Sequence, residues 1–256
     1  MPPKSIPTSS ALAGRFRRRL LAWFRRHGRD LPWRRTRDPY RVLVSEFMLQ
    51  QTPVRRVEEY YPRFVARFPD LHAIAAAPPS QVREAWEGLG YYRRAASLHR
   101  LARAVVDDHG GRLPTEAGAL RRLPGVGRYT AGAVAAFAHE RAEPCVDTNV
   151  ARVLRRAFHP RLGDSARHRE RLWETAEALQ PRRGPRAWAF NQALMELGAL
   201  VCGARTPRCG ACPVRGLCRT GGPRPAGDAE PPRAVRASRP RAARRPRAAP
   251  TRGSTG

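Results

Sequence analysis

The chain has 256 residues and a formal net charge of +28, with 49 lysines and arginines against 21 aspartates and glutamates. A hydrophobic fraction of 41% is sufficient for a folded core, whereas the longest apolar run, around residues 130–138, is too short for the roughly 20 residues that cross a bilayer. We therefore expect a soluble, cytoplasmic protein with no membrane-spanning segment, whose large partner is a polyanion, with nucleic acid favoured over a membrane surface.

Helical periodicity is the dominant pattern along the chain. Apolar side chains recur every three or four residues between 12 and 24, with arginines on the opposite face. Breaks at proline and glycine residues, and at the pair Pro69 and Asp70, separate this segment from further predicted helices at 40–50, 53–67, 80–87, 92–108, 116–123, 129–138, 148–158, 166–179 and 186–201. Strand signals are nearly absent. The sequence therefore predicts an all-α fold of about ten helices.

Neither end of the chain has the composition of a folded segment. Residues 1–10 lack an apolar core of signal-peptide length, and we expect them to be disordered. Residues 219–256 hold ten arginines and seven prolines with almost no large apolar side chains. Such a segment cannot bury enough surface to offset its ordering entropy, so we expect a disordered tail. It is either a solvated terminus or an arm that binds phosphates without regard to sequence.

Four of the five cysteines form a cluster in the sequence. Cys202, Cys209, Cys212 and Cys218 lie within 17 residues, separated by six, two and five residues. Without an export signal, such clustering indicates a metal site rather than a disulfide framework. Four thiolates can hold either Zn²⁺ or a [4Fe–4S] cluster, and the single Cys-x2-Cys pair with long arms favours the bulkier cluster. The distant Cys145 is interpreted as an ordinary buried thiol.

Two segments combine a turn with the start of a helix. Gly125 and Gly127 lie between two predicted helices, where backbone N–H groups can approach an anion at a helix N-terminus. The alternative is a plain turn joining two helices. Asp147 opens the predicted helix 148–158, and its carboxylate is either a functional group or an N-cap.

These segments together resemble the helix-hairpin-helix DNA glycosylase superfamily. The resemblance is carried by residues 123–130, by residues 146–150 and by the four-cysteine spacing, and it covers about residues 11–218. It implies that Gly125 and Gly127 bind the DNA backbone and that Asp147 is catalytic. It also implies that the four cysteines hold a [4Fe–4S] cluster, which removes the zinc alternative.

Three further motifs resemble one branch, the MutY family of adenine glycosylases, which act on adenine mispaired with guanine or oxidised guanine. They are Leu-Pro-Trp-Arg at 31–34, Ser-Glu-Phe-Met-Leu-Gln-Gln-Thr at 45–52 and Gly-Leu-Gly-Tyr-Tyr at 88–92. The branch resemblance implies that one glutamate is the catalytic acid and that four other side chains bind DNA or line its pocket. The acid is Glu46, and the DNA-binding residues are Arg34, Gln51, Tyr91 and Gln192. Of these, Gln51 and Tyr91 are the candidates for filling or wedging the duplex beside the lesion, with ordinary surface or core residues as the alternative.

Position 129 separates this branch from bifunctional relatives such as endonuclease III. Those relatives carry a lysine there that forms a Schiff base with the sugar, whereas this chain has Tyr129. Its only lysine is Lys4, so a lysine-based lyase is disfavoured by composition alone. We therefore expect a monofunctional glycosylase.

The proposed chemistry divides the work between two carboxylates. Glu46 stands in the apolar run 42–49, where burial would raise its pKa to suit a general acid that protonates adenine at N7. A solvent-facing glutamate is the alternative. Asp147 would stay ionised and stabilise the positive sugar, while Tyr129 and Asn149 would orient Asp147 and the water.

From this resemblance we expect two helical lobes with the DNA site between them. Residues 11–35 and 145–218 would form the cluster lobe, and residues 36–144 a six-helix lobe with the helix-hairpin-helix at about 119–138. The partner would be double-stranded DNA carrying the mispair, bound by a monomer in the nucleoid. The rival hypotheses are a thymine or uracil mismatch glycosylase, an endonuclease III-like protein, and a cluster-bearing DNA-binding or redox-sensing protein that has lost catalysis.

Overall fold

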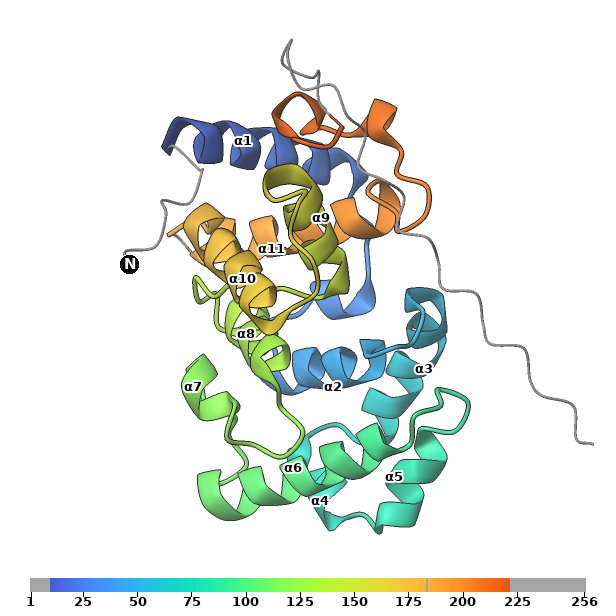
Figure 1. Cartoon of the computed structure of the whole chain (residues 1–256). Coiled ribbons are helices and arrows are strands. Elements are labelled where there is room, and N and C mark those ends of the chain that lie inside the picture. The colour runs from blue at the N-terminus through green and yellow to red at the C-terminus, as the bar shows by residue number, and fades with distance from the viewer. Residues whose placement is uncertain (1–9, 183, 222–256) are drawn as a thin grey trace, which may run out of the picture. The chain divides into compact units, whose positions relative to one another are not determined.

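The computed structural model describes residues 10–182 and 184–221, and every regular element in this part of the chain is a helix (Figure 1). The predicted all-α fold is confirmed. The α-helices are α1 (Ser10–His27), α2 (Pro39–Leu49), α3 (Val54–Arg67), α4 (Leu71–Ala76), α5 (Pro79–Ala85), α6 (Arg93–His109), α7 (Ala117–Leu120), α8 (Arg128–Ala138), α9 (Thr148–Phe158), α10 (Ala166–Leu179) and α11 (Gly184–Leu200). Short 3-10 helices are η1 (Pro32–Arg34), η2 (Cys209–Ala211) and η3 (Arg215–Leu217).

The ten predicted helices all occur, and the short helix α4 was missed. Pro69 and Asp70 were interpreted only as helix breakers. In the structure Asp70 begins α4, because its carboxylate accepts a hydrogen bond of 2.8 Å from the backbone N–H of Ala73. A side-chain acceptor at this position satisfies one of the unpaired N–H groups of a first helical turn.

Buried apolar side chains form two clusters. One extends from Leu31 to Cys145 and includes the fully buried Phe47 and Trp86. The other joins α1 to α9, α10 and α11, with Phe16 packed on Phe158 at a centroid distance of 5.1 Å. Each such side chain contributes roughly 1.5–3 kcal/mol when it leaves water. Figure 1 shows α1 beside α11, the first and last α-helices of the described residues.

Most of the two terminal segments predicted to be disordered, 1–10 and 219–256, lies outside the described residues. The last described residues are tied to α9, since the N–H of Arg219 donates to the carbonyl of Ala157 and that of Thr220 to the carbonyl of Arg156. Within the described part of the chain, no helix is long and apolar enough to cross a membrane.

Candidate active site

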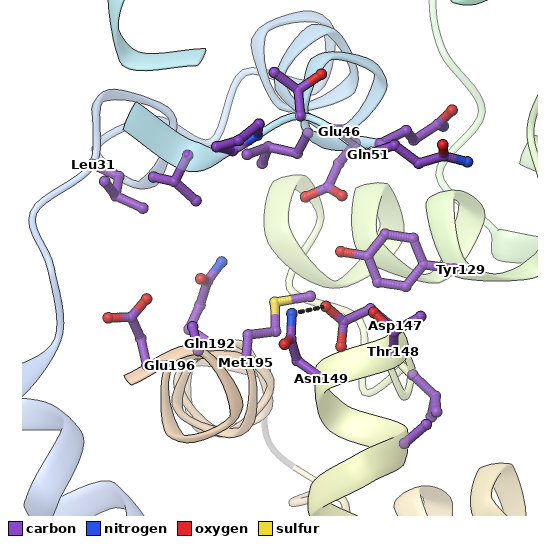
Figure 2. A pocket seen from close by; sticks show the side chains of 18 of the residues that line it. Leu31, Glu46, Gln51, Tyr129, Asp147, Thr148, Asn149, Gln192, Met195 and Glu196 are labelled. Atoms are coloured by element: carbon purple, nitrogen blue, oxygen red, sulfur yellow. Dashed lines mark hydrogen bonds between the residues drawn. The ribbon is translucent and has the colours of Figure 1, made fainter. Parts of the chain in front are cut away.

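A pocket of about 820 Å³ gathers most of the predicted site residues (Figure 2). Its walls come from the end of α2 and the loop after it, from the starts of α8 and α9, and from α10, α11 and the segment around η1. The volume falls in the range of pockets that enclose a small molecule or a single base. The predicted residues that line it are Arg34, Glu46, Gln51, Tyr129, Asp147, Asn149 and Gln192.

Glu46 is the buried acid of this pocket. Its residue is only 5% exposed, and its Oε2 atom has no hydrogen-bond partner. Burial is the main cause that raises its pKa from 4.5 to about 7, and the negative charge of Asp147 raises it further. A hydrogen bond with Tyr129 opposes both effects. The carboxyl group is therefore held near half-protonation at neutral pH, as general acid catalysis requires.

Asp147 lies in a different environment at the N-terminus of α9. Its Oδ1 accepts a hydrogen bond of 2.7 Å from the backbone N–H of Val150, and its Oδ2 one of 3.0 Å from the side chain of Asn149. Figure 2 shows the second bond as a dashed line. Both oxygens of this carboxylate thus accept hydrogen bonds, and they do so at a helix N-terminus, where the helix dipole favours negative charge. Asp147 is therefore both the N-cap of α9 and a residue that lines the pocket, so the two alternative interpretations of this residue are compatible.

Tyr129 belongs to the first turn of α8 and lines the pocket between these carboxylates (Figure 2). Burial raises its pKa well above the ordinary value, and the charges of Glu46 and Asp147 raise it further. The phenol therefore remains protonated and can donate a hydrogen bond.

A buried ion-pair network forms another wall of the pocket. The guanidinium of Arg34 donates from Nε to Oε1 of Gln192 at 2.7 Å and from Nη2 to Glu196 at 2.9 Å. Arg29 also binds Glu196, at 2.6 Å. Burial by itself would raise the pKa of Glu196, but the hydrogen bonds and charges of the two arginines outweigh it and hold that pKa below 4.5. Since Arg34 occupies the amide oxygen of Gln192, the amide NH₂ is left free to face a ligand.

Sequence reasoning missed Arg29 and Glu196. Glu196 is completely buried on α11, in an apolar stretch, and it lines the pocket. A carboxylate inside an apolar helical run supported the assignment that the family motif gave to Glu46, and the same observation applied to residues 186–201 points to Glu196. Arg29 lies in the loop before η1 and had no local signal.

The predicted DNA-binding residues occupy different places. Gln51 lines the pocket. Tyr91, Gly125 and Gly127 do not line it, and Tyr91 is 60% exposed. Gly125 has φ +76°, and a Cβ there would lie 2.8 Å from the Ser97 side chain, so this turn requires glycine.

The four clustered cysteines line a separate cavity of about 230 Å³. A guanidinium N–H of Arg156 donates to the sulfur of Cys202 at 3.4 Å, and the backbone N–H of Gly221 to the sulfur of Cys218 at 3.4 Å. Bonds of this kind stabilise thiolate ligands. Yet no group of three metal-binding side chains in the described part of the chain could hold a single ion. The fifth cysteine, Cys145, is fully buried as predicted.

Comparison with known proteins places these observations in one family. A family model described as HhH-GPD superfamily base excision DNA repair protein matches residues 44–178. An adenine DNA glycosylase of Mycobacterium tuberculosis is 50% identical over 196 residues, which make up 76% of this chain and 64% of that protein. A thymine-DNA glycosylase of Aeropyrum pernix is 38% identical over 205 residues, 79% of this chain and 92% of that protein. The solved structure of a thermostable thymine-DNA glycosylase matches with a TM-score of 0.76 and 34% identity, covering 82% of this chain and 97% of that one.

The coverage is unequal in the two directions. The chain spans just under two thirds of the length of the mycobacterial adenine DNA glycosylase, but nearly all of the archaeal thymine-DNA glycosylase.

Proposed function

The chain belongs to the HhH-GPD superfamily of base excision DNA repair proteins, and from this premise we propose that it is a monofunctional DNA glycosylase that removes adenine mispaired with guanine or oxidised guanine. The resemblance to the glycosylase superfamily predicted from the sequence is confirmed by the family match. The adenine branch is supported by 50% identity to an adenine DNA glycosylase. We expect the enzyme to act as a monomer on double-stranded DNA of the nucleoid.

The observation that carries the proposal is a buried, protonatable Glu46 facing the same pocket as Asp147, whose two oxygens accept hydrogen bonds. Adenine is a poor leaving group as an anion, and protonation of the base removes that difficulty. Removal of a pyrimidine does not require N7 protonation. A glutamate whose pKa is raised to about 7 is therefore the group that a purine glycosylase needs.

The reaction begins when the mispaired adenosine leaves the base stack and enters the pocket, at a cost that is lowest for a mismatched base. Glu46 transfers its proton to N7, and the electron pair of the C1′–N9 bond moves to the departing adenine. Asp147 stabilises the positive charge that develops on the sugar, directly or as a covalent ester, as paired carboxylates do in glycoside hydrolysis. Water, oriented by Tyr129 and Asn149, then adds at C1′ and displaces Asp147 where an ester has formed, and its proton passes to the Glu46 carboxylate.

The cysteine cavity suits a [4Fe–4S] cluster better than a zinc ion. Four thiolates around a cavity of about 230 Å³ fit a larger cluster. When bound, the cluster would cross-link the loop 202–218, and no catalytic step passes through it. Iron analysis and visible absorbance of the purified protein test this assignment, because zinc gives no colour.

A thymine-mismatch glycosylase is the second candidate, favoured by the archaeal relative that this chain covers almost completely. A strand-release assay separates the two. Duplexes carry adenine opposite guanine, adenine opposite oxidised guanine, or thymine opposite guanine, and alkali is added after the reaction. We expect breaks at adenine in the first two and none at thymine. Breaks confined to thymine would refute the adenine assignment, and breaks without alkali would refute monofunctional action.

A further inference from the structure

Arg94 is a buried arginine without a carboxylate partner among the ion pairs of the described residues. It lies in the first turn of α6 and is 8% exposed. Its guanidinium is satisfied almost entirely by backbone carbonyls. The acceptors for Nη1 are the carbonyls of Phe47, Met48 and Gln50, and those for Nη2 are the carbonyls of Leu89 and Gly90 and the hydroxyl of Thr52.

These acceptors belong to two separate segments. The first is the C-terminal end of α2 with residues 50–52 after it, and the second is the turn 88–91. The last carbonyls of a helix have no partners within the helix, and a cation there is favoured by the helix dipole. Arg94 thus caps α2, the helix that carries Glu46, and joins its end to the turn.

Each segment contains one residue whose backbone adopts the left-handed conformation that side chains disfavour. Gln51 has φ +57° and Tyr91 has φ +49°, and the only other described non-glycine residue with positive φ is Glu140. Such conformations persist where the surroundings hold them, and they concentrate at functional sites. The guanidinium of Arg94 also lies 5.5 Å from the ring centroid of Tyr91. The Arg94 side chain therefore contacts the backbone segments that carry both exposed residues, Gln51 and Tyr91.

We propose that Arg94 is a positioning residue that holds Gln51 and Tyr91 together as a preformed pair, ready to enter the duplex when the target base leaves the stack. This inference rests on the proposed function, because it assigns the pair a role in base extrusion. Without Arg94, the two segments would have to be ordered during binding, and that ordering would slow extrusion.

The geometry requires arginine rather than any cation. A guanidinium presents five N–H donors in a rigid planar fork, so it can bind carbonyls on two sides at once. A lysine has three donors on one nitrogen and cannot reach both sets of acceptors. Arg94→Lys therefore keeps the charge but loses the hydrogen bonds that connect the two segments, whereas Arg94→Met loses both the charge and these hydrogen bonds.

Base extrusion can be measured apart from excision. The adenine analogue 2-aminopurine is placed opposite guanine, and its fluorescence rises when it unstacks. In an Asp147→Asn background the base is not released, so the signal reports extrusion alone. We expect both Arg94 variants to bind the duplex and to lose most of the fluorescence rise. With Asp147 intact, we expect single-turnover excision to be slower by about 10²-fold, the cost of misplacing a reacting group by about 1 Å.

Two controls separate positioning from stability and charge. Arg93→Met removes the same charge from the exposed neighbouring position and should leave extrusion unchanged. Leu98→Ala leaves a cavity at a fully buried position of α6, one helical turn after Arg94, and removes none of the hydrogen bonds that join the two segments. If Leu98→Ala matches the loss of melting temperature in Arg94→Lys but keeps the fluorescence rise, positioning is supported. If it loses the rise equally, Arg94 acts only through stability and the proposal is wrong.

The remaining outcomes are also decisive. Extrusion within twofold of the unchanged protein in either folded Arg94 variant would overturn the proposal, and if Arg94→Met does not fold, Arg94→Lys decides alone. Failure of the proposed function gives a different result. The protein with Arg94 intact would then show no fluorescence rise for 2-aminopurine opposite guanine beyond that for the same base opposite thymine.

Discussion

The two walls of the pocket that carry Glu46 and Asp147 present the same functional group in opposite surroundings. Glu46 projects from within the apolar helix α2, and one of its oxygens has no partner. Asp147 stands at the N-terminus of α9, where a backbone N–H and the Asn149 amide each bind one of its oxygens. The difference lies in the partners of the two carboxyl groups: burial without a partner for Oε2 raises the pKa of Glu46, whereas both oxygens of Asp147 accept hydrogen bonds at a helix N-terminus.

The largest effect on the excision rate should come from replacing the carboxylate of Asp147, at the N-terminus of α9. Asp147→Asn keeps a good N-cap, so unfolding free energy should change by only a few tenths of a kcal/mol. Loss of the carboxylate that faces the developing positive sugar should lower single-turnover excision by about 10³-fold or more. Duplex binding should persist in a mobility-shift measurement. Unchanged turnover would show that the two walls do not divide the work as proposed.

Removing the acidic proton of Glu46, on α2, should have the next largest effect on the excision rate. Glu46→Gln should slow adenine excision by about 10²-fold, the usual contribution of a general acid. The unchanged protein needs the protonated acid, so its excision rate should fall as pH rises above about 7. The variant should lack this decline, and rate profiles between pH 5 and 9 test it. A decline of equal size in the variant would assign that titration to another group.

The same residue should make stability depend on pH. The pKa of Glu46 is raised by burial from 4.5 unfolded to about 7 folded, so the folded state binds the proton more tightly. This contribution is fully present below about pH 4.5 and is lost as pH rises to about 7, by roughly 3 kcal/mol in total. Urea unfolding of the unchanged protein and of Glu46→Gln across this range measures the difference. Parallel curves would mean that Glu46 ionises without penalty.

Tyr129→Phe should have the smallest effect on the excision rate, and it tests how a hydrogen bond changes the pKa of Glu46. The hydrogen bond with Tyr129 lowers the pKa of Glu46, so its removal should raise that pKa and move the decline in excision rate to higher pH. The maximum rate should fall by only a few-fold, since both carboxylates remain. A shift to lower pH in the same rate profiles would contradict the assigned hydrogen bond.

Local sequence predicted most of the fold because helical periodicity and helix breaks are short-range signals. The ten predicted helices occur, whereas α4 was missed because Asp70 was interpreted as a breaker and acts as a cap. The association of Glu46, Tyr129 and Asp147 was predicted only through resemblance to a family. No local pattern relates residues separated by a hundred positions.

The sequence by itself determined the helical class, the basic charge, the cysteine spacing and the motifs that indicate a glycosylase, since each depends on residues close together in the chain. Only the tertiary structure decided that Arg34 pairs with Glu196 and orients Gln192. The same holds for Arg94, which joins the segment of Gln51 to that of Tyr91. Burial and hydrogen-bond partners come from helices that meet across long sequence distances. The same packing sets the pKa of Glu46, which composition and periodicity do not contain.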